Sequence, residues 1–505
     1  MGNQDQERRR RQAQSRDGLL DLRAKRKCLP CQQDDISQGA AHIEIPSLPE
    51  DIWRHIHSLM SMRDAARAAC VSRSFVSSWR CHSNLSFSSK ILGLNNNACG
   101  EDKLATEYYN IVDHILTRHS GIGIKKLKIE IGLNYSAKGS CYLNNWLQNA
   151  VKPGIEELSV MLRYNKKHNF NFPCSLLSNG SGDSVKCLYL SGFSFHPGIT
   201  FGDLRSLTRL HLSSVCIKDD ELSCLLSHSL ALELLDIRYC DSITRLKVPC
   251  ILQRLSHLIV LGCSKLKVID NEAPNVSSFE FQGYNSVQLS LGETLQMKSL
   301  CVERPGYIFH ARANLPSIMP NLESLTIDSY QEVAYAPMSC SKFLYLRHLS
   351  IRLTGAPFFV AYDYLSLASF INAAPLLETF NLYVWQLDKY NVSIFADAAD
   401  LRLTREEQHH SLKSVRINAF NSAKSLVELT CHILENTTSL ECLTLEAAES
   451  CYKNSETGKC VPFGRDISME GQRGILAIRR YIEPMVPSTV KLHVLEPCSC
   501  LAIED

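Results

Sequence analysis

Apolar residues return in a short alternating pattern along most of the chain from residue 120 onward. Two apolar side chains flank one variable residue, as in Leu188-Tyr189-Leu190 and Leu210-His211-Leu212. Alternation with a period of two is typical of a β-strand that turns one face toward a core. We expect 14 strands of this kind, starting at Leu127, Leu158, Leu188, Leu210, Leu235, Leu258, Phe279, Leu300, Leu325, Leu349, Phe380, Val415, Leu443 and Leu492.

The spacing of these segments indicates a repeat. From Leu188 to Leu349 their first residues are 21 to 25 positions apart, within the ~20–29 residue period of leucine-rich repeats. A single unit cannot bury its apolar face, but stacked units build a continuous core. We therefore predict an α/β fold in which residues 121–497 form a leucine-rich-repeat solenoid, with a parallel sheet on its concave face. Ile475, Ile478 and Ile482 predict a C-terminal capping helix, and we expect a loop from Ser450 to Val461.

A helical pattern precedes the repeats. The first predicted helix follows Pro49 and carries its apolar face at Ile52, Ile56, Leu59 and Met60. A second is expected from Asp64 to Cys70, with Asp64 as its N-cap. A third is expected to carry Val71, Phe75 and Trp79 at intervals of four. Three short helices are too few to bury all these faces, so the remaining apolar surface predicts a binding partner.

This helical stretch resembles an F-box of the plant type. The resemblance rests on Leu48-Pro49-x-x-Ile52, on Asp64-Ala65-Ala66 and on Cys70-Val71-Ser72-Arg73. It extends through Ser72-Arg73-Ser74-Phe75-x-x-x-Trp79 to Asn84-Leu85-Ser86-Phe87, with Phe75 where the family usually has tryptophan. The resemblance implies docking onto a Skp-type adaptor of a cullin–RING ubiquitin ligase. The residues that it implies for adaptor binding are Leu48, Pro49, Ile52, Ile56, Leu59, Val71, Phe75 and Trp79.

The resemblance also suggests the domain organisation. We assign residues 1–44 to a disordered basic tail, 45–90 to the F-box, 91–120 to a linker and 121–497 to the repeats and their cap. The tail contains two basic clusters, from Arg8 to Arg11 and from Arg23 to Lys27, which fit either a two-part nuclear import signal or a solvated tail. Cys28 and Cys31 have the spacing of half a zinc site, but no further ligands follow at a suitable distance.

The residue between each apolar pair is expected to point out of the core and to form a recognition surface. No charge dominates these positions, which argues against a nucleic-acid groove. Glu280, Glu303 and Asp328 favour a basic segment on the bound protein, with a merely solvated face as the alternative. The candidate substrate-binding residues are Tyr189, His211, Asp236, Glu280, Glu303, Asp328 and Arg416.

Composition narrows the class of protein further. A net charge of +2 gives no global field that would attract nucleic acid or membranes. The chain shows no signal peptide, so its 21 cysteines are expected as reduced thiols. Cys240 and Cys263 are expected to pack in the turns that follow two strands. We expect the protein in the nucleus, the cytoplasm or both.

Catalytic signatures are missing from the sequence. We find no nucleophile elbow, no phosphate-binding loop and no zinc-binding helix motif. We therefore expect a non-catalytic substrate-recognition subunit without a cofactor or metal. The alternatives are an F-box scaffold that does not promote ubiquitination, a small-molecule co-receptor and, least favoured, an enzyme built on the repeats.

Overall fold

The structure is a computed structural model of the chain. It divides into two compact units, Met1–Pro49 and Glu50–Asp505, and the fold described below is that of the second. The described residues are 48–71, 73–94, 101–120, 123–132, 137–163, 170–178, 180–197, 202–284, 287–292, 294–330, 332, 341–354, 362–385, 392–396, 401–402, 408–448, 451–453, 458–462 and 465–496. The expected basic tail, its two clusters and the Cys28–Cys31 pair lie outside them.

Three short helices open the second unit, as the apolar pattern predicts: α2 (Glu50–Leu59), α3 (Met62–Ala69) and α4 (Arg73–Arg80). The expected cap of the second helix is wrong. Ser61 is the N-cap of α3, because its hydroxyl accepts a hydrogen bond from the Asp64 backbone N–H at 3.2 Å. Asp64 lies in the first turn instead, where its carboxylate accepts from the Ser61 hydroxyl at 2.7 Å. Val71 lies between α3 and α4 rather than inside the third helix.

The main sheet has 15 strands, each parallel to its neighbours. It contains all 14 strands predicted from the alternating pattern, preceded by β1. In spatial order the strands are β1 (Asn84–Phe87), β2 (Lys126–Ile131), β3 (Glu157–Leu162), β5 (Cys187–Ser191), β7 (Arg209–Ser213), β8 (Leu234–Arg238), β10 (His257–Leu261), β12 (Ser278–Gln282), β14 (Ser299–Glu303), β15 (Ser324–Tyr330), β16 (His348–Thr354), β17 (Thr379–Trp385), β18 (Ser414–Phe420), β19 (Cys442–Ala447) and β22 (Lys491–Leu495).

The first strand, β1, joins the helical module to the repeats. It follows α4 after three residues and pairs with β2 in register, with Leu85 opposite Leu127 and Phe87 opposite Ile129. The Asn84 side-chain amide donates to the Ser58 carbonyl at 3.3 Å, which ties the strand to α2. The last residues of the F-box motif are therefore also the first rung of the repeat sheet.

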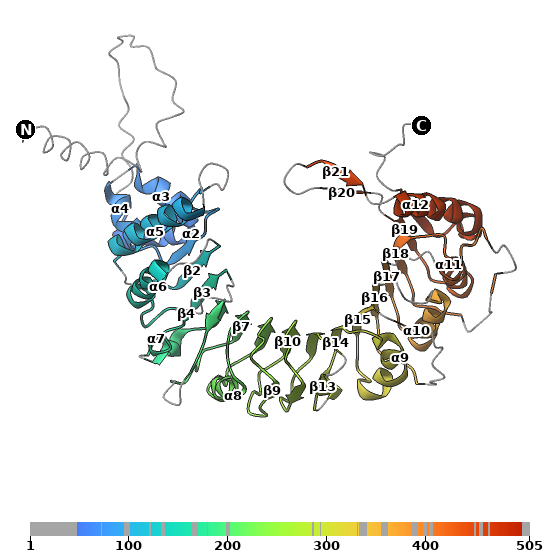
Figure 1. The fold of residues 1–505 in the computed structure, drawn as a ribbon, viewed down its shortest axis with the longest axis horizontal. Helices are drawn as coiled ribbons and strands as arrows, with labels where there is room; N and C mark the ends of the chain where they lie inside the picture. Colours follow the sequence, from blue (N-terminus) through green and yellow to red (C-terminus); the bar gives the residue numbers. More distant parts are fainter. Residues whose placement is uncertain are drawn as a thin grey trace, which may run out of the picture. The chain divides into compact units, whose positions relative to one another are not determined.

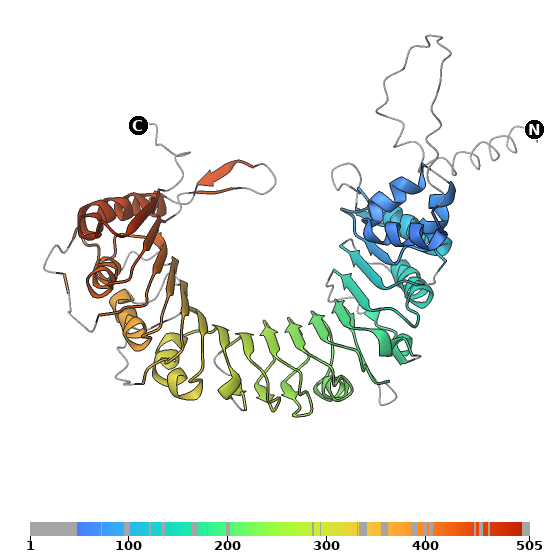
Figure 2. The ribbon, with the colours of Figure 1, turned by 180° about the vertical axis from the view of Figure 1, so that it is seen from behind.

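Helices cover one side of the main sheet, as Figures 1 and 2 show. They are α5 (Glu101–Arg118), α6 (Ala137–Ala150), α7 (Ser175–Ser178), α8 (Asp219–Ser227), α9 (Tyr307–Ile318), α10 (Ala368–Ala373), α11 (Lys424–Asn436) and α12 (Arg465–Ala477). Residues 91–120, which we assigned to a linker, contain α5, and its Tyr108 and Val112 are buried in the core of the repeats.

In the central repeats a second sheet takes the place of helices on this side (Figure 1). It contains β9 (Arg245–Val248), β11 (Val268–Asn271) and β13 (Gln288–Ser290), all parallel. Short helical turns complete the second layer: η2 (Gly182–Ser184), η3 (Thr294–Gln296), η4 (Tyr364–Leu367), η5 (Ile478–Ile482) and η6 (Glu483–Met485). Two further pairs of short strands are β4 (Phe170–Asn171) with β6 (Phe193–Ser194) and β20 (Cys451–Lys453) with β21 (Cys460–Pro462). The last pair corrects the loop expected from Ser450 to Val461.

The cap agrees with the prediction: α12 and η5 bury Ile475, Ile478 and Ile482. The turn cysteines agree as well, since Cys240 and Cys263 are buried and free. The Cys240 thiol donates to the Arg238 carbonyl at 3.4 Å, and burial raises the pKa of the Cys263 thiol to about 11. These thiols therefore pack as small apolar groups. No helix in the described part of the chain is long and apolar enough to span a membrane.

A ladder of residues just before the strands fixes the register of successive repeats. The Lys125 carbonyl accepts from the backbone N–H groups of Glu156 and Glu157 at 2.8 and 2.9 Å, and the pattern repeats up to Glu441. Charged side chains on this ladder alternate in sign, so that the Glu156 carboxylate lies between the amines of Lys125 and Lys186. Glu378 likewise pairs with Arg347 and Lys413. The main-chain bonds set the pairing, and the charges add a modest surface contribution.

Candidate functional site: two protein-binding surfaces

The helical module exposes large apolar side chains. Leu59 at the end of α2 is 76% exposed and Val71 between α3 and α4 is 78% exposed, and Leu48 and Ile52 are also exposed. Pro49 is exposed too, whereas Ile56 is half-buried. Solvent exposure of several large apolar residues on so small a module is typical of a protein-binding surface.

Two of the residues implied for adaptor binding point into the module instead. The Phe75 ring packs against Trp53 at 4.8 Å and against His57 at 5.2 Å between ring centroids. The Trp79 ring stacks on His82 at 5.7 Å and packs against the core of the repeats. Phe75 and Trp79 therefore hold α4 in place, and the exposed apolar surface comes from the other residues.

Buried histidines lie where the helices meet β1. His57 and His82 are each about 1% exposed. Burial lowers the pKa of both imidazoles, and for His82 the neighbouring His119 and His57 lower it further. Both rings are therefore neutral at neutral pH, which suits an apolar junction.

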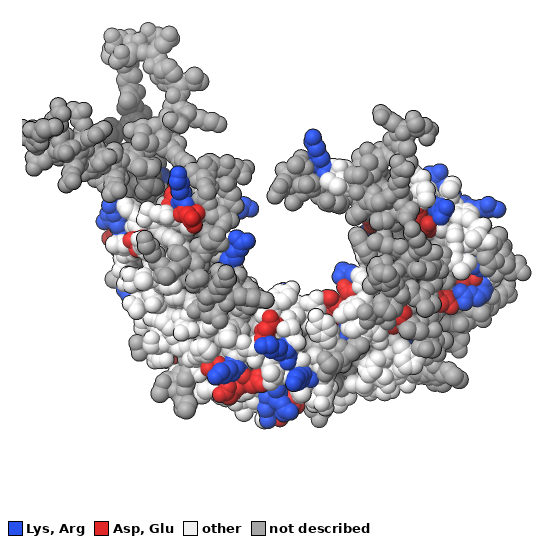
Figure 3. Space-filling view, in the orientation of Figure 1, with Lys and Arg blue, Asp and Glu red and all other residues white. Residues whose placement is uncertain are grey.

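The second surface is the side of the main sheet that the helices leave uncovered, which we call the open face. The variable residue of each strand points to it, as the burial pattern of β5, with buried Leu188 and Leu190 around half-buried Tyr189, illustrates. Figure 3 shows the side of the molecule seen in Figure 1, where basic and acidic side chains stand next to one another over the central repeats. No single sign of charge dominates this side.

The structure brings three of the candidate residues together on the adjacent strands β5, β7 and β8. The Tyr189 ring stacks on His211 at 5.6 Å. Asp236 is buried instead of exposed, because His211 Nδ1 lies 3.0 Å and Arg238 Nε 2.7 Å from its two carboxylate oxygens. Burial alone would raise the pKa of Asp236, but hydrogen bonds from His211 and Arg238 hold it below its usual value. The carboxylate charge of Asp236 is thus compensated by neighbouring side chains of the same protein.

The acidic candidates lie on neighbouring strands. Cross-strand pairing puts Glu280 opposite Cys301 and Glu303 opposite Asp328. Asp328 is bound by Arg352, with nitrogen and oxygen 2.8 Å apart. Burial raises the pKa of the Cys301 thiol to about 11, with a further contribution from the three surrounding carboxylates. The thiol is therefore protonated and unreactive.

Arg416 is not part of this acidic group. It lies on β18 opposite Asn381, and two strands, β16 and β17, separate it from Asp328. Sequence reasoning missed Arg238 and Arg352, which neutralise two of the candidate acids. Both lie two residues beyond the variable position of their strands, so the alternation itself was the available signal. The side chain of Trp385, a further aromatic on β17, lies outside the described residues.

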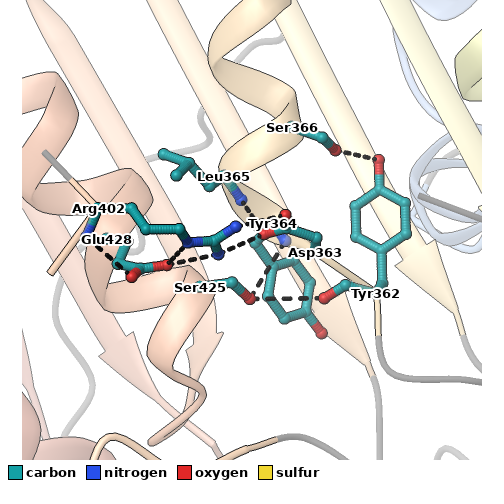
Figure 4. Close-up of polar contacts among 8 residues, drawn as sticks. All are labelled: Tyr362, Asp363, Tyr364, Leu365, Ser366, Arg402, Ser425 and Glu428. Atoms are coloured by element: carbon teal, nitrogen blue, oxygen red, sulfur yellow. Dashed lines mark hydrogen bonds and ion pairs between the residues drawn. The ribbon is translucent and has the colours of Figure 1, made fainter. Parts of the chain in front are cut away.

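One polar cluster is structural rather than functional (Figure 4). The Arg402 guanidinium binds Glu428 on α11 at 2.6 Å and Asp363, just before η4, at 2.9 Å. Glu428 is fully buried, and these hydrogen bonds raise the pKa of Arg402. Tyr362 and Ser425 complete the hydrogen-bonded link between η4 and α11. Among the described residues no group of His, Cys, Asp and Glu could hold a metal ion.

A three-helix module with exposed apolar residues, continuing into stacked leucine-rich repeats, defines an F-box/leucine-rich-repeat protein. Residues 45–87 match the F-box domain. Residues 115–499 match the family described as At1g61320/AtMIF1, LRR domain, and the chain belongs to this family.

Two known proteins are similar to this chain. The chain is 25% identical over 199 residues to the F-box/FBD/LRR-repeat protein At1g13570 of Arabidopsis thaliana, a match that covers 39% of this chain and 45% of that relative. Among solved structures, an internalin from Listeria monocytogenes matches over 68% of this chain and 88% of its own, with 14% identity and a TM-score of 0.34. That likeness is too distant to support an argument.

Proposed function

We propose that this chain is the substrate-recognition subunit of an SCF-type cullin–RING ubiquitin ligase. The F-box would bind a Skp-type adaptor, and the open face of the repeats would bind the target protein. The observation that carries the proposal is the exposure of Leu59 and Val71 within a segment that matches the F-box domain. The chain itself supplies no reacting group in this role. It raises the effective concentration of the target beside the ubiquitin carrier.

The test uses the purified full chain and a purified Skp-type adaptor. The double variant L59D/V71D places two charges on the proposed contact, so we expect adaptor affinity to fall by about 30-fold or more. The matched control is L230D, which changes an equally large side chain that is 56% exposed on the repeats. Its adaptor affinity should stay unchanged.

Thermal melting of all three proteins checks that each variant is folded. Reconstituted ubiquitin transfer to a protein bound by the repeats then tests the ligase role and separates it from a scaffold. Adaptor binding by L59D/V71D that equals that of the unmodified chain would contradict the assignment of the contact.

A further inference from the structure

Two carboxylates on adjacent central strands of the open face have no ion-pair partner within the described part of the chain. Asp236 is bound by Arg238 and Asp328 by Arg352. Glu280 on β12 and Glu303 on the adjacent β14 form no ion pair with any described residue and are half-buried. The middle of the open face therefore carries two carboxylates that no described cation binds directly, although Arg238 interacts electrostatically with Glu280.

Tyr239, an exposed aromatic residue, follows β8, two strands from β12, and has an unfavourable backbone conformation. The residue after each of the strands β5, β7, β8 and β10 has a positive φ: Gly192 at 77°, Ser214 at 52°, Tyr239 at 52° and Gly262 at 64°. Glycine adopts this conformation freely, whereas a bulky residue there is strained. Tyr239 is nevertheless 55% exposed, so burial in the core does not compensate the strain.

The Tyr239 ring lies over the chain at the end of β10. A Cβ atom added to Gly262 would come within 2.5 Å of two ring carbons, so the ring packs directly on the glycine. Ile259 and Leu261 of β10 are half-buried on the open face, and Tyr284, just after β12, is 60% exposed. Exposed tyrosines next to partly exposed aliphatic residues are the side chains that protein interfaces favour.

We propose that the open face of β8 to β14 binds an extended segment of the target that carries a lysine or arginine close to a large apolar residue. Glu280 and Glu303 would pair with the cation, and Tyr239, Ile259 and Leu261 would contact the apolar side chain. Strands β8 and β12 both flank β10, so they are about 10 Å apart across the sheet. Tyr239 also lies three residues beyond Asp236, which is in register with Ile259 and Glu280, so the offset along the strands is about another 10 Å. Four or five extended residues span the resulting distance of about 14 Å. This inference rests on the proposed function, because it names the class of target.

The negative charge of Glu280 and Glu303 favours a basic segment over an acidic peptide or a nucleic acid. An acidic peptide or a nucleic acid would place further negative charge beside Glu280 and Glu303 and would be repelled. A cation bound by a carboxylate forms a charge-assisted hydrogen bond, and half-buried carboxylates are less screened than those in open solvent.

The experiment measures binding of the full chain to an immobilised library of ten-residue synthetic peptides, in which one position is fixed as Lys, Arg, Asp, Leu or Phe and the rest vary. We expect selection of Lys or Arg with Leu or Phe a few residues away. The variant E280Q/E303Q should select Lys and Arg about tenfold less strongly and keep the preference for Leu and Phe. Its matched control is E130Q/E446Q, which changes open-face glutamates on the outer strands β2 and β19 and should alter neither preference.

The variant Y239G separates recognition from folding. Glycine relieves the positive φ, so this protein should melt at the same or a higher temperature than the unmodified chain, yet lose the preference for Leu and Phe. Selection of acidic or uncharged segments, no selection at all, or an unchanged preference in E280Q/E303Q would overturn the inference. Adaptor binding is measured separately. A chain that binds the adaptor but selects no basic segment retains the proposed function and refutes this inference alone.

Discussion

The F-box module and the repeat array treat their apolar residues in opposite ways. In the array Leu235 and Leu258 are fully buried, because each strand is covered by the next repeat and by the layer behind it. In the module Leu59 and Val71 are more than three-quarters exposed. An amphipathic helix therefore does not complete a core by itself, because its apolar face must be covered by a further element of the same kind. Where the chain provides none, the apolar surface is left for another protein.

The largest effect is expected in the array. Leu258→Ala removes a buried side chain from β10 and should lower the free energy of unfolding by about 2–5 kcal/mol. Leu230→Ala, at a position 56% exposed, should change it by less than about 0.5 kcal/mol. Urea denaturation followed by circular dichroism measures both. Equal losses would show that burial does not distinguish the two positions.

The array also contains a buried charge that depends on its partner. Arg402→Met removes the cation that binds fully buried Glu428, so the carboxylate loses its ion pair inside the core. We expect a loss of about 2 kcal/mol in the free energy of unfolding. Arg205→Met, which breaks a surface pair with Asp203, is the control and should cost much less. Equal losses for Arg402→Met and Arg205→Met would indicate that Glu428 reaches solvent when Arg402 is absent.

The stability of the junction between the F-box module and the repeats should depend on pH. His57 and His82 have pKa values below the usual value of 6.5 because they are buried. Below pH ~6.5 the unfolded chain binds protons that the folded chain does not, so stability falls as the pH drops toward the folded-state pKa values. We expect a lower urea midpoint at pH 5.5 than at pH 7.5.

A double variant, H57L/H82L, should show a smaller fall between the two pH values. The control H55L changes an exposed neighbour on α2 and should keep the full dependence. If the two variants respond identically, the buried imidazoles do not cause the effect.

The smallest effect is expected on the charge ladder. Glu378→Gln removes a carboxylate that pairs with Arg347 and Lys413 at the surface. A slight loss of stability is expected at low salt, and it should vanish in 1 M NaCl because exposed ion pairs are screened. A loss that persists at high salt would indicate a hydrogen-bonding role for the carboxylate instead.

The alternation of apolar residues was sufficient to predict 14 strands of the main sheet, because those from β2 to β19 bury side chains on a period of two and β22 half-buries Leu492 and Val494 in the same pattern. Strand β1 was missed since Leu85-Ser86-Phe87 was assigned to the F-box motif, although it alternates in the same way. The second sheet was missed because its strands are only three or four residues long and because β11 and β13 contain no apolar pair around one residue, although Leu246 and Val248 of β9 form one.

The recognition surface was predictable only in outline. The period of two indicates that Glu280 and Asp236 face the same side, but it gives no information on their partners. Pairing of Asp236 with His211 depends on the register between β7 and β8, which one sequence does not determine. The strained conformation of Tyr239 likewise depends on the geometry of the turn, and no local motif marks it.

Strand β1 belongs to both the F-box module and the repeat sheet. Because Leu85 and Phe87 are paired with β2 and buried, the module cannot rotate freely relative to the repeats. Neighbouring strands of the sheet are about 4.8 Å apart, so a target segment bound one strand further along is shifted by that distance. In the ligase that we propose, the strands that bind the target would decide which of its lysines come within reach of the ubiquitin carrier.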